Sequence, residues 1–274
     1  MIVEIAPAKI NLALHVRRRR VDGYHDIETL FAFARDGDTI LVEASESDRF
    51  TIVGPFAAGL RAEADNLVTR AAAAFGKTFG IADAHAITLD KRLPIASGIG
   101  GGSADAAATL RALAQLHAVP LDSQRLYAIA AALGADVPAC LDGRTTLGTG
   151  KGDALVAIPG LPDTPLLLVN PGVGVSTGAV FGTWDGIDRG GIGEGDLLAR
   201  ALAGRNDLEP PARALAPMIG DVRAMLDAAP GVLLSRMSGS GATCFALFDS
   251  VAACATAAAS ARERAWWSLQ TALT

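Results

Sequence analysis

The chain has 274 residues, of which 50% are hydrophobic and 19% are charged, a balance typical of a folded protein and not of a disordered one. Its formal net charge of -5 provides no basic excess for a nucleic-acid backbone, so we expect no DNA or RNA partner. Three widely spaced cysteines and a start without a basic region before an apolar one favour a reduced, cytoplasmic protein without a signal peptide.

The first half of the chain predicts both strands and helices. In residues 9–16, alternate apolar residues share one face of a strand, and Lys9 and Asn11 lie side by side on the other. Further strands are predicted over 27–34, over 39–45 after a turn at Asp36 and Gly37, over 50–54 and over 85–93. Helices are predicted over 66–79, capped by Asp65 or Asn66, over 103–117 and over 122–134.

A cluster of proline and glycine near residue 160 predicts a boundary between an N-terminal domain over 1–160 and a C-terminal domain over 161–274. The second domain is expected to contain strands over 165–172, 231–237 and 243–248, and helices over 175–184, 196–203, 212–228 and from residue 251. The uncharged run over 164–184 contains Asn170, Pro171 and four glycines, so we expect no membrane span there. Strands mixed with helices in both halves predict a two-domain α+β protein.

The stretch "GIGGGS" over residues 98–103 has the composition of an anion-binding loop. It lacks the lysine of a Walker A loop, and Ser103 stands where a dinucleotide-binding turn needs glycine. Its glycines expose successive backbone N–H groups, and the helix that follows adds its own free N–H groups and positive dipole end. We therefore expect phosphate binding, although a tight loop that needs glycine only for its dihedral angles is the alternative.

Asp136 and Lys9 are candidates for a catalytic pair. Asp136 follows the predicted helix end at Gly134 within apolar sequence, so its burial needs a partner of opposite charge, which Lys9 provides. The alternative is that Asp136 stabilises a turn and Lys9 is a solvated strand residue. These residues alone leave both interpretations open.

Three motifs resemble those of the GHMP kinases, the family of galactokinase, homoserine kinase and mevalonate kinase. They are "PAKINLALHV" near the start, "PIASGIGGGSADAA" over 94–107 and "RMSGSGATCFALF" over 236–248. Within the family, "PAKINL", "GYHDIETLF" and "LGADVPACL" are similar to the members that phosphorylate the 2-hydroxyl of a cytidine diphosphate conjugate of methylerythritol, in the non-mevalonate route to isoprenoid precursors. The resemblance implies an N-terminal domain like domain 2 of ribosomal protein S5 and a ferredoxin-like C-terminal domain.

The resemblance also implies the use of ATP with Mg²⁺ and a set of phosphate-binding residues. Lys9 and Asp136 are then the catalytic residues, with Asp136 either a general base or an orienting group. The residues expected to bind ATP are Pro94, Ile95, Ala96, Ser97, Gly98, Ile99, Gly100, Gly101, Gly102, Ser103 and Ala104. Those expected near the substrate phosphates are Ser238, Gly239, Ser240 and Gly241.

The residues expected to bind substrate are Asn11, Tyr24, His25, Lys151 and Phe181. The resemblance implies Tyr24 and His25. Asn11 is chosen for its place beside Lys9 on the strand, Phe181 as a second aromatic face, and Lys151 as a cation that could reach a ligand oxygen from its glycine-rich turn. Tyr24 would stack on cytosine and His25 would hydrogen-bond its edge, while the alternative is an aromatic packed at a hairpin tip. Phe181 is equally compatible with a core position. No metal site built from protein side chains is expected, since the sequence has no zinc motif and no clear acidic magnesium ligand. Asp105 either approaches magnesium or only compensates the dipole at the start of its helix.

Other functions remain possible at this point. One is a GHMP kinase of the homoserine or mevalonate type, which the "GYH" sequence at Tyr24 disfavours because those substrates have no base. Another is a non-catalytic metabolite sensor, which the presence of both Lys9 and Asp136 disfavours. We expect small-molecule substrates, no membrane partner, and a monomer or weak homodimer.

Overall fold

The computed structural model describes residues 1–60 and 66–274. Contacts within the chain divide it into two compact units, which are described separately. Unit 1 comprises Met1–Ala8, Asp36–Ile95 and Gly100–Gly143, and unit 2 comprises Lys9–Arg35, Ala96–Ile99 and Arg144–Thr274. The predicted boundary near residue 160 stays a prediction.

Two long strands, β1 (Ile2–Arg19) and β2 (His25–Ser45), pair with each other and contribute residues to both units. The predicted turn at Asp36 and Gly37 is wrong, because β2 continues through both residues. Gly37 is required for another reason. A Cβ atom at this position would lie 1.8 Å from the carbonyl oxygen of Ala6, so only glycine allows the two backbones to approach this closely.

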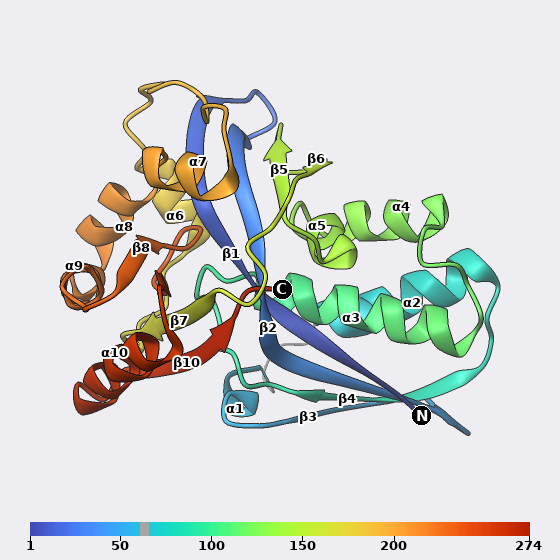
Figure 1. Ribbon diagram of the computed structural model, residues 1–274. Helices are drawn as coiled ribbons and strands as arrows, with labels where there is room; N and C mark the ends of the chain where they lie inside the picture. Colours follow the sequence, from blue (N-terminus) through green and yellow to red (C-terminus); the bar gives the residue numbers. More distant parts are fainter. Residues whose placement is uncertain (61–65) are drawn as a thin grey trace. The chain divides into compact units, whose positions relative to one another are not determined.

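In unit 1, β4 (Ala84–Asp90) pairs antiparallel with residues 39–45 of β2 and parallel with β3 (Arg49–Val53). The helices of this unit are α1 (Ala57–Leu60), α2 (Leu67–Phe79), α3 (Gly101–Leu116), α4 (Gln124–Leu133) and α5 (Val137–Asp142). Helices α2 to α5 gather on one side of these strands (Figure 1). Asn66 caps α2 by accepting from the Val68 N–H at 2.9 Å, whereas Asp65, the other predicted cap, lies outside the described residues.

In unit 2, β5 (Thr146–Thr149) pairs with residues 29–31 of β2 and with β6 (Ala154–Ala157). A second sheet is antiparallel, in the order β10 (Trp267–Ala272), β7 (Pro165–Asn170), β9 (Cys244–Phe248), β8 (Val232–Met237). The helices are α6 (Thr177–Gly182), α7 (Leu197–Ala203), α8 (Glu209–Leu215), α9 (Met218–Asp227) and α10 (Val251–Glu263). Apolar side chains from β7, β9, α9 and α10 share one buried core.

The observed elements differ from the predicted ones at a proline between two helices and at several short elements. The single helix predicted over 212–228 is wrong: α8 and α9 are separate, with Pro217 at the start of α9. Proline has no N–H group and disfavours a helical residue before it, so α8 ends there. The short elements β5, β6 and α5, and the final strand β10, were not predicted from the sequence.

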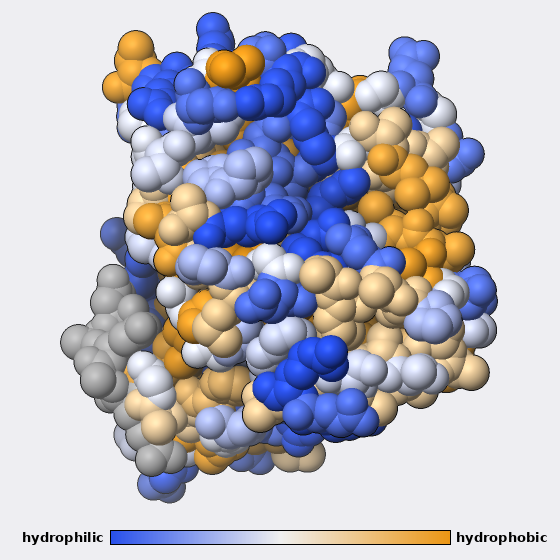
Figure 2. Space-filling model, turned by 90° about the vertical axis from the view of Figure 1, so that its left-hand side faces the viewer, coloured by the Kyte–Doolittle hydropathy of each residue, from blue (hydrophilic) through white to orange (hydrophobic). Residues whose placement is uncertain are grey.

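On the face shown in Figure 2, hydrophilic residues surround several separate groups of hydrophobic residues. In the part of the chain that the structure describes, no helix is long and apolar enough to cross a membrane.

Candidate active site

Lys9 and Asn11 lie on one face of β1, as the alternation predicts, and both are buried. The Lys9 ammonium donates to Asn11 Oδ1 at 3.0 Å and lies 4.5 Å from the centre of the Phe31 ring. The Asn11 amide in turn donates to Thr29 Oγ1 at 2.7 Å. The interpretation of Lys9 as a solvated strand residue is therefore wrong. Its charge is held inside the protein by an amide oxygen and an aromatic face.

The second and third motifs, both rich in glycine, meet β1 within unit 2. The Ser238 hydroxyl accepts from the Asn11 N–H at 3.3 Å and donates to the Gly98 carbonyl at 2.9 Å. The Lys9 N–H donates to the Ile99 carbonyl at 3.0 Å. A Cβ atom on Gly98 would lie 2.4 Å from the Ser238 carbonyl oxygen. Lys9, Asn11, Gly98 and Ser238 therefore form one junction of three chain segments that are far apart in the sequence.

The other residues of the third motif are also held in this unit. Asn206 donates from its amide nitrogen to the Gly239 carbonyl at 2.8 Å. Ser240 Oγ lies 2.9 Å from Thr177 Oγ1, and the Gly241 N–H donates to the Ser238 carbonyl at 2.9 Å. Gly239 and Gly241 both have positive φ, at 54° and 83°. The motif is thus an ordered turn.

The glycine loop leads directly into α3. Gly98 and Gly100 adopt positive φ angles of 76° and 65°, which favour glycine. Gly100 occupies the N-cap position of α3, where no side chain accepts from the helix and the first turn holds no acidic residue. The first N–H groups of a helix have no acceptor within the helix, so this end of α3 suits an anion. The loop is divided between the units: Ala96–Ile99 belong to unit 2, and Pro94, Ile95 and Gly100–Ala104 to unit 1.

Asp136 occupies the N-cap position of α5 in unit 1 and is half-buried. Its side chain makes no capping hydrogen bond to the helix, so capping does not explain the aspartate at this position. Lys9 belongs to unit 2, and its pairing with Asp136 stays a prediction.

Four of the five residues predicted to bind substrate lie in two aromatic contacts of unit 2. The Lys151 ammonium lies 4.9 Å from the centre of the Tyr24 ring, which is 55% exposed. The ring centres of His25 and Phe181 lie 4.9 Å apart, with an interplanar angle of 35°. Asn11, the fifth, belongs to the junction with Ser238.

His25 has the features of a group that receives a ligand. Its Nε2 atom is buried and has no hydrogen-bond partner among the described residues. Burial lowers the pKa of the His25 imidazole, and the nearby Arg19 guanidinium lowers it further, so the ring is held neutral at pH 7. A neutral imidazole offers one donor and one acceptor nitrogen, which suits the edge of a nucleobase.

Trp184 was not predicted as part of this region. The centres of the Trp184 and His25 rings lie 5.7 Å apart, and the two rings are nearly perpendicular, with an interplanar angle of 82°. The Trp184 Nε1 atom is also buried and has no hydrogen-bond partner in the described chain. Arg19 holds the segment after α6 by donating to the carbonyl of Trp184 at 2.6 Å. The only sequence signal was an aromatic residue three positions after Phe181.

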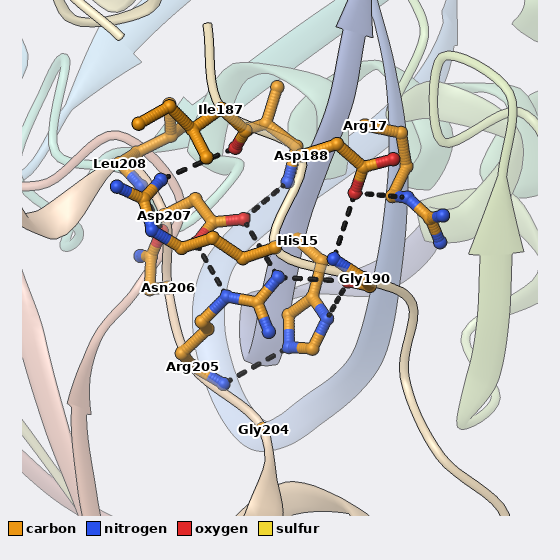
Figure 3. Close-up of polar contacts among 12 residues, drawn as sticks. His15, Arg17, Ile187, Asp188, Gly190, Gly204, Arg205, Asn206, Asp207 and Leu208 are labelled. Carbon is orange, nitrogen blue, oxygen red and sulfur yellow. Dashed lines mark hydrogen bonds and ion pairs between the residues drawn. The ribbon is translucent and has the colours of Figure 1, made fainter. Parts of the chain in front are cut away.

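Figure 3 shows how the segments before and after α7 contact β1. His15 lies close enough to the Gly190 carbonyl for a hydrogen bond from Nδ1, at 3.1 Å, and its Nε2 accepts from the Arg205 N–H at 3.2 Å. These contacts require the neutral ring with its proton on Nδ1. Asp207 accepts from the Val16 N–H at 2.8 Å and from Arg205 Nε at 2.7 Å. The network fixes β1 beyond Lys9 and Asn11.

The acidic residues of the described chain form no obvious metal site. No group of three or more His, Cys, Asp or Glu side chains suited to a metal ion occurs among residues 1–60 and 66–274. Asp105, the residue considered for magnesium, is buried and forms an ion pair with Lys91 at 2.7 Å.

Two family models match this chain. The GHMP kinases N terminal domain matches residues 66–144, and the GHMP kinases C terminal domain matches residues 188–263. The chain belongs to the GHMP kinase family. The predicted two-domain GHMP kinase fold, with its mixture of helices and strands, is confirmed.

Two relatives within the family have the same name. A protein of Rhizorhabdus wittichii named 4-diphosphocytidyl-2-C-methyl-D-erythritol kinase is 56% identical over 272 residues, which cover 97% of this chain and 92% of its own. A Sphingopyxis alaskensis protein of the same name is 51% identical over 97% of this chain and 96% of its own. These names agree with the subfamily that the sequence motifs indicate.

Solved structures are similar along the whole length of the chain. A crystal structure of 4-(cytidine 5'-diphospho)-2C-methyl-D-erythritol kinase has a TM-score of 0.80 at 35% identity and covers 99% of both chains. Homoserine kinase from Cytophaga hutchinsonii has a TM-score of 0.72 at 21% identity, over 99% of this chain and 93% of its own. The similarity to homoserine kinase, at 21% identity, supports the fold alone.

Proposed function

We propose that this chain is an ATP-dependent kinase that phosphorylates the 2-hydroxyl of 4-diphosphocytidyl-2-C-methyl-D-erythritol, in the non-mevalonate route to isoprenoid precursors. The observation that carries the proposal is the junction of Lys9 and Asn11 with Gly98 and Ser238 in unit 2. It joins a buried cation to two glycine-rich segments, which is what transfer of a charged phosphoryl group needs. The named relatives support the choice of acceptor.

The phosphates of ATP would bind the loop from Pro94 to Ala104. The uncapped start of α3 provides backbone N–H donors and the positive end of the helix dipole. We propose that Ser238, Gly239, Ser240 and Gly241 provide further backbone donors near the substrate phosphates. Magnesium would arrive with ATP as part of the nucleotide substrate, because it keeps several waters and is commonly held through substrate phosphates.

Lys9 and Asp136 would carry the transfer. The Lys9 ammonium would neutralise charge that develops on the phosphoryl group, and a buried cation is more effective in this role than a solvated one. The Asp136 carboxylate would orient the acceptor hydroxyl and accept its proton.

The cytidine end of the substrate would bind at the aromatic contacts of unit 2. Tyr24 is exposed enough to stack on the base, and Phe181 would provide a second aromatic face. The buried Nε2 of His25 would hydrogen-bond the edge of the base. Lys151 lies at the Tyr24 ring and would reach a phosphate oxygen. Asn11 would help to place the acceptor hydroxyl.

We further propose a cytoplasmic enzyme that is a monomer or weak homodimer and binds no nucleic acid. Cys140, Cys244 and Cys254 are buried and form no disulfide in the described part of the chain, which is compatible with a reducing compartment. The net charge of -5 disfavours nucleic acid.

The proposal is tested by measuring ADP release from magnesium-ATP with four acceptor conditions. These are 4-diphosphocytidyl-2-C-methyl-D-erythritol, homoserine, mevalonate and no acceptor. We expect turnover with the first alone. Turnover with homoserine or mevalonate would assign a different kinase of the family. ATP binding without turnover in any condition would favour a metabolite sensor.

A further inference from the structure

A buried ion cluster joins three elements of unit 1. The Lys91 ammonium lies 2.6 Å from Asp38 Oδ2 and 2.7 Å from Asp105 Oδ2. All three side chains are at most 3% exposed. Asp38 belongs to β2, Lys91 directly follows β4, and Asp105 lies in α3. The cluster therefore connects the sheet to the helix that begins at the glycine loop.

The cluster also holds the segment that leads into the loop. Asp38 Oδ1 accepts from the backbone N–H groups of Arg92 and Leu93, at 2.6 and 2.8 Å. Leu93 is followed directly by Pro94, the first residue of the loop. One carboxylate thus fixes the chain before the loop, while Lys91 and Asp105 reach the helix after it.

Stability alone is a weak explanation for this cluster. Burying an ion pair in protein often contributes less to stability than apolar residues of the same size. Here two carboxylates share one ammonium, and Asp105 Oδ1 is buried with no hydrogen-bond partner among the described residues. Burial raises the pKa of Asp105 to about 7, against the opposing effect of Lys91. Because the buried charges contribute little to stability, we infer that the cluster serves to position the elements that it joins.

The cluster lies close to Gly101, the first residue of α3. A Cβ atom at Gly101 would lie 3.0 Å from Lys91 Nζ and 3.7 Å from Asp38 Oδ2. A side chain at this position would require the ammonium to shift by a few tenths of an ångström. The backbone of the first helical turn therefore rests directly against the Lys91 ammonium.

We propose that Lys91 is a positioning residue for phosphate binding, which sets the place of the α3 N-terminus through its contact with Gly101 and its ion pairs with Asp38 and Asp105. The proposal rests on the proposed binding of ATP at this loop. Lys91 itself need not touch the nucleotide. Its effect is to fix the backbone N–H groups that do, and small misplacements of binding groups have large effects on phosphoryl transfer.

The test uses three variants of the full-length protein: Lys91→Met, Asp105→Asn and the double variant. Lys91→Met leaves two buried carboxylates facing each other, so we expect a lower Tm. The double variant removes one of these charges and should regain most of the lost Tm. Lys77→Met is the matched control, because Lys77 is an exposed lysine of α2 in the same unit.

Two measurements are made on each variant: the Kd for ATP without acceptor, and KM for both substrates with kcat. We expect the double variant to bind ATP about tenfold to a hundredfold more weakly, while KM for the acceptor changes less than twofold. Lys77→Met should match the wild type in all of these values. If Lys91→Met fails to fold, the double variant alone carries the test.

The result that overturns the proposal is a double variant whose Kd for ATP is within twofold of the wild type. The cluster would then serve stability alone. Failure of the proposed function looks different, since the wild type itself would then release no ADP with the acceptor, whether or not it binds ATP.

Discussion

The Lys9 ammonium donates to Asn11 Oδ1 at 3.0 Å, from two positions earlier on the same face of β1. Asn11 is in turn held by Thr29 and by Ser238. Lys9 is therefore buried in an arrangement that orients its ammonium group. A lysine fixed in this way is prepared to stabilise a developing negative charge with little reorganisation.

Replacing Lys9 by Met should lower kcat by about 100-fold to 1,000-fold, because a preorganised charge at the transferring group is lost. The apolar stem of methionine can still pack on Phe31, so the Tm should change little. Steady-state kinetics with both substrates and a thermal unfolding curve check this. An unchanged kcat would show that Lys9 is only a structural residue.

Replacing Asp136 by Asn should lower kcat by about 100-fold to 10,000-fold, since the amide keeps the shape but accepts no proton. The KM for ATP should change little. Because asparagine keeps the size and shape of aspartate, the variant should remain nearly as stable as the wild type. A large loss of Tm with normal specific activity of the folded fraction would instead indicate a turn-stabilising residue.

Replacing Gly98 by Ala should destabilise the protein and weaken ATP binding. The residue has φ of 76°, and its Cβ atom would lie 2.4 Å from the Ser238 carbonyl oxygen, so strain and a backbone clash add together. Gly80→Ala is the control. Gly80 has φ of 70° but no atom within 4 Å of the Cβ position, so only the strain, of about 1 to 2 kcal/mol, remains.

Chemical denaturation of the two glycine variants measures the difference. We expect Gly98→Ala to lose more free energy of unfolding than Gly80→Ala, and only Gly98→Ala to lose affinity for ATP. Equal losses of stability with equal ATP affinity would contradict the close packing of the loop on Ser238.

Part of this account was predictable from the sequence because the signals are local. Alternation over residues 9–16 placed Lys9 and Asn11 on one strand face, and the glycine run before alanine-rich sequence predicted the loop and α3. The Asn66 cap is also local. By contrast, the Asp36-Gly37 pair is typical of a turn. Only the folded structure shows that glycine is needed at position 37 because the backbone at Ala6 lies so close.

The cluster at Lys91 could not be predicted, because its members come from separate elements. Asp38, Lys91 and Asp105 are brought together by the pairing of β2 with β4 and by the packing of unit 1. An aspartate within alanine-rich helical sequence was the only hint. His25 and Trp184 are likewise far apart in the sequence and meet only in the folded chain.

The network around His15 predicts a specific dependence of stability on pH. Burial lowers the pKa of the His15 imidazole, and the charge of Arg205 lowers it further. The unfolded chain, whose histidine pKa is about 6.5, therefore binds a proton before the folded chain does. The free energy of unfolding should fall as pH drops below about 6.5.

His15→Asn tests this dependence, because asparagine retains a donor for the Gly190 carbonyl and does not titrate. Its Tm should be lower than that of the wild type at pH 8, since the acceptor for the Arg205 N–H is lost. Between pH 8 and pH 5.5 its Tm should then fall less than that of the wild type. Some slope should remain, because burial also lowers the pKa of His25 and His85. An identical slope would contradict the role given to His15.

Replacing Phe181 by Leu should raise KM for the acceptor about fivefold to tenfold, since one aromatic face at His25 is lost. The KM for ATP should stay the same. Isothermal titration with cytidine diphosphate provides a second measurement, in which the affinity should fall by a similar factor. A normal affinity for cytidine diphosphate would place Phe181 in the core alone.

The most direct test of the proposed function is to identify the product by phosphorus NMR after incubation with magnesium-ATP and 4-diphosphocytidyl-2-C-methyl-D-erythritol. We expect one new phosphomonoester signal without three-bond coupling to hydrogen, because the carbon at the 2-position of the methylerythritol group carries no hydrogen, and ADP in equal amount. The Asp136→Asn variant should form neither at a comparable rate. ADP without a phosphorylated acceptor, or phosphate on a different hydroxyl, would contradict the function proposed for this chain.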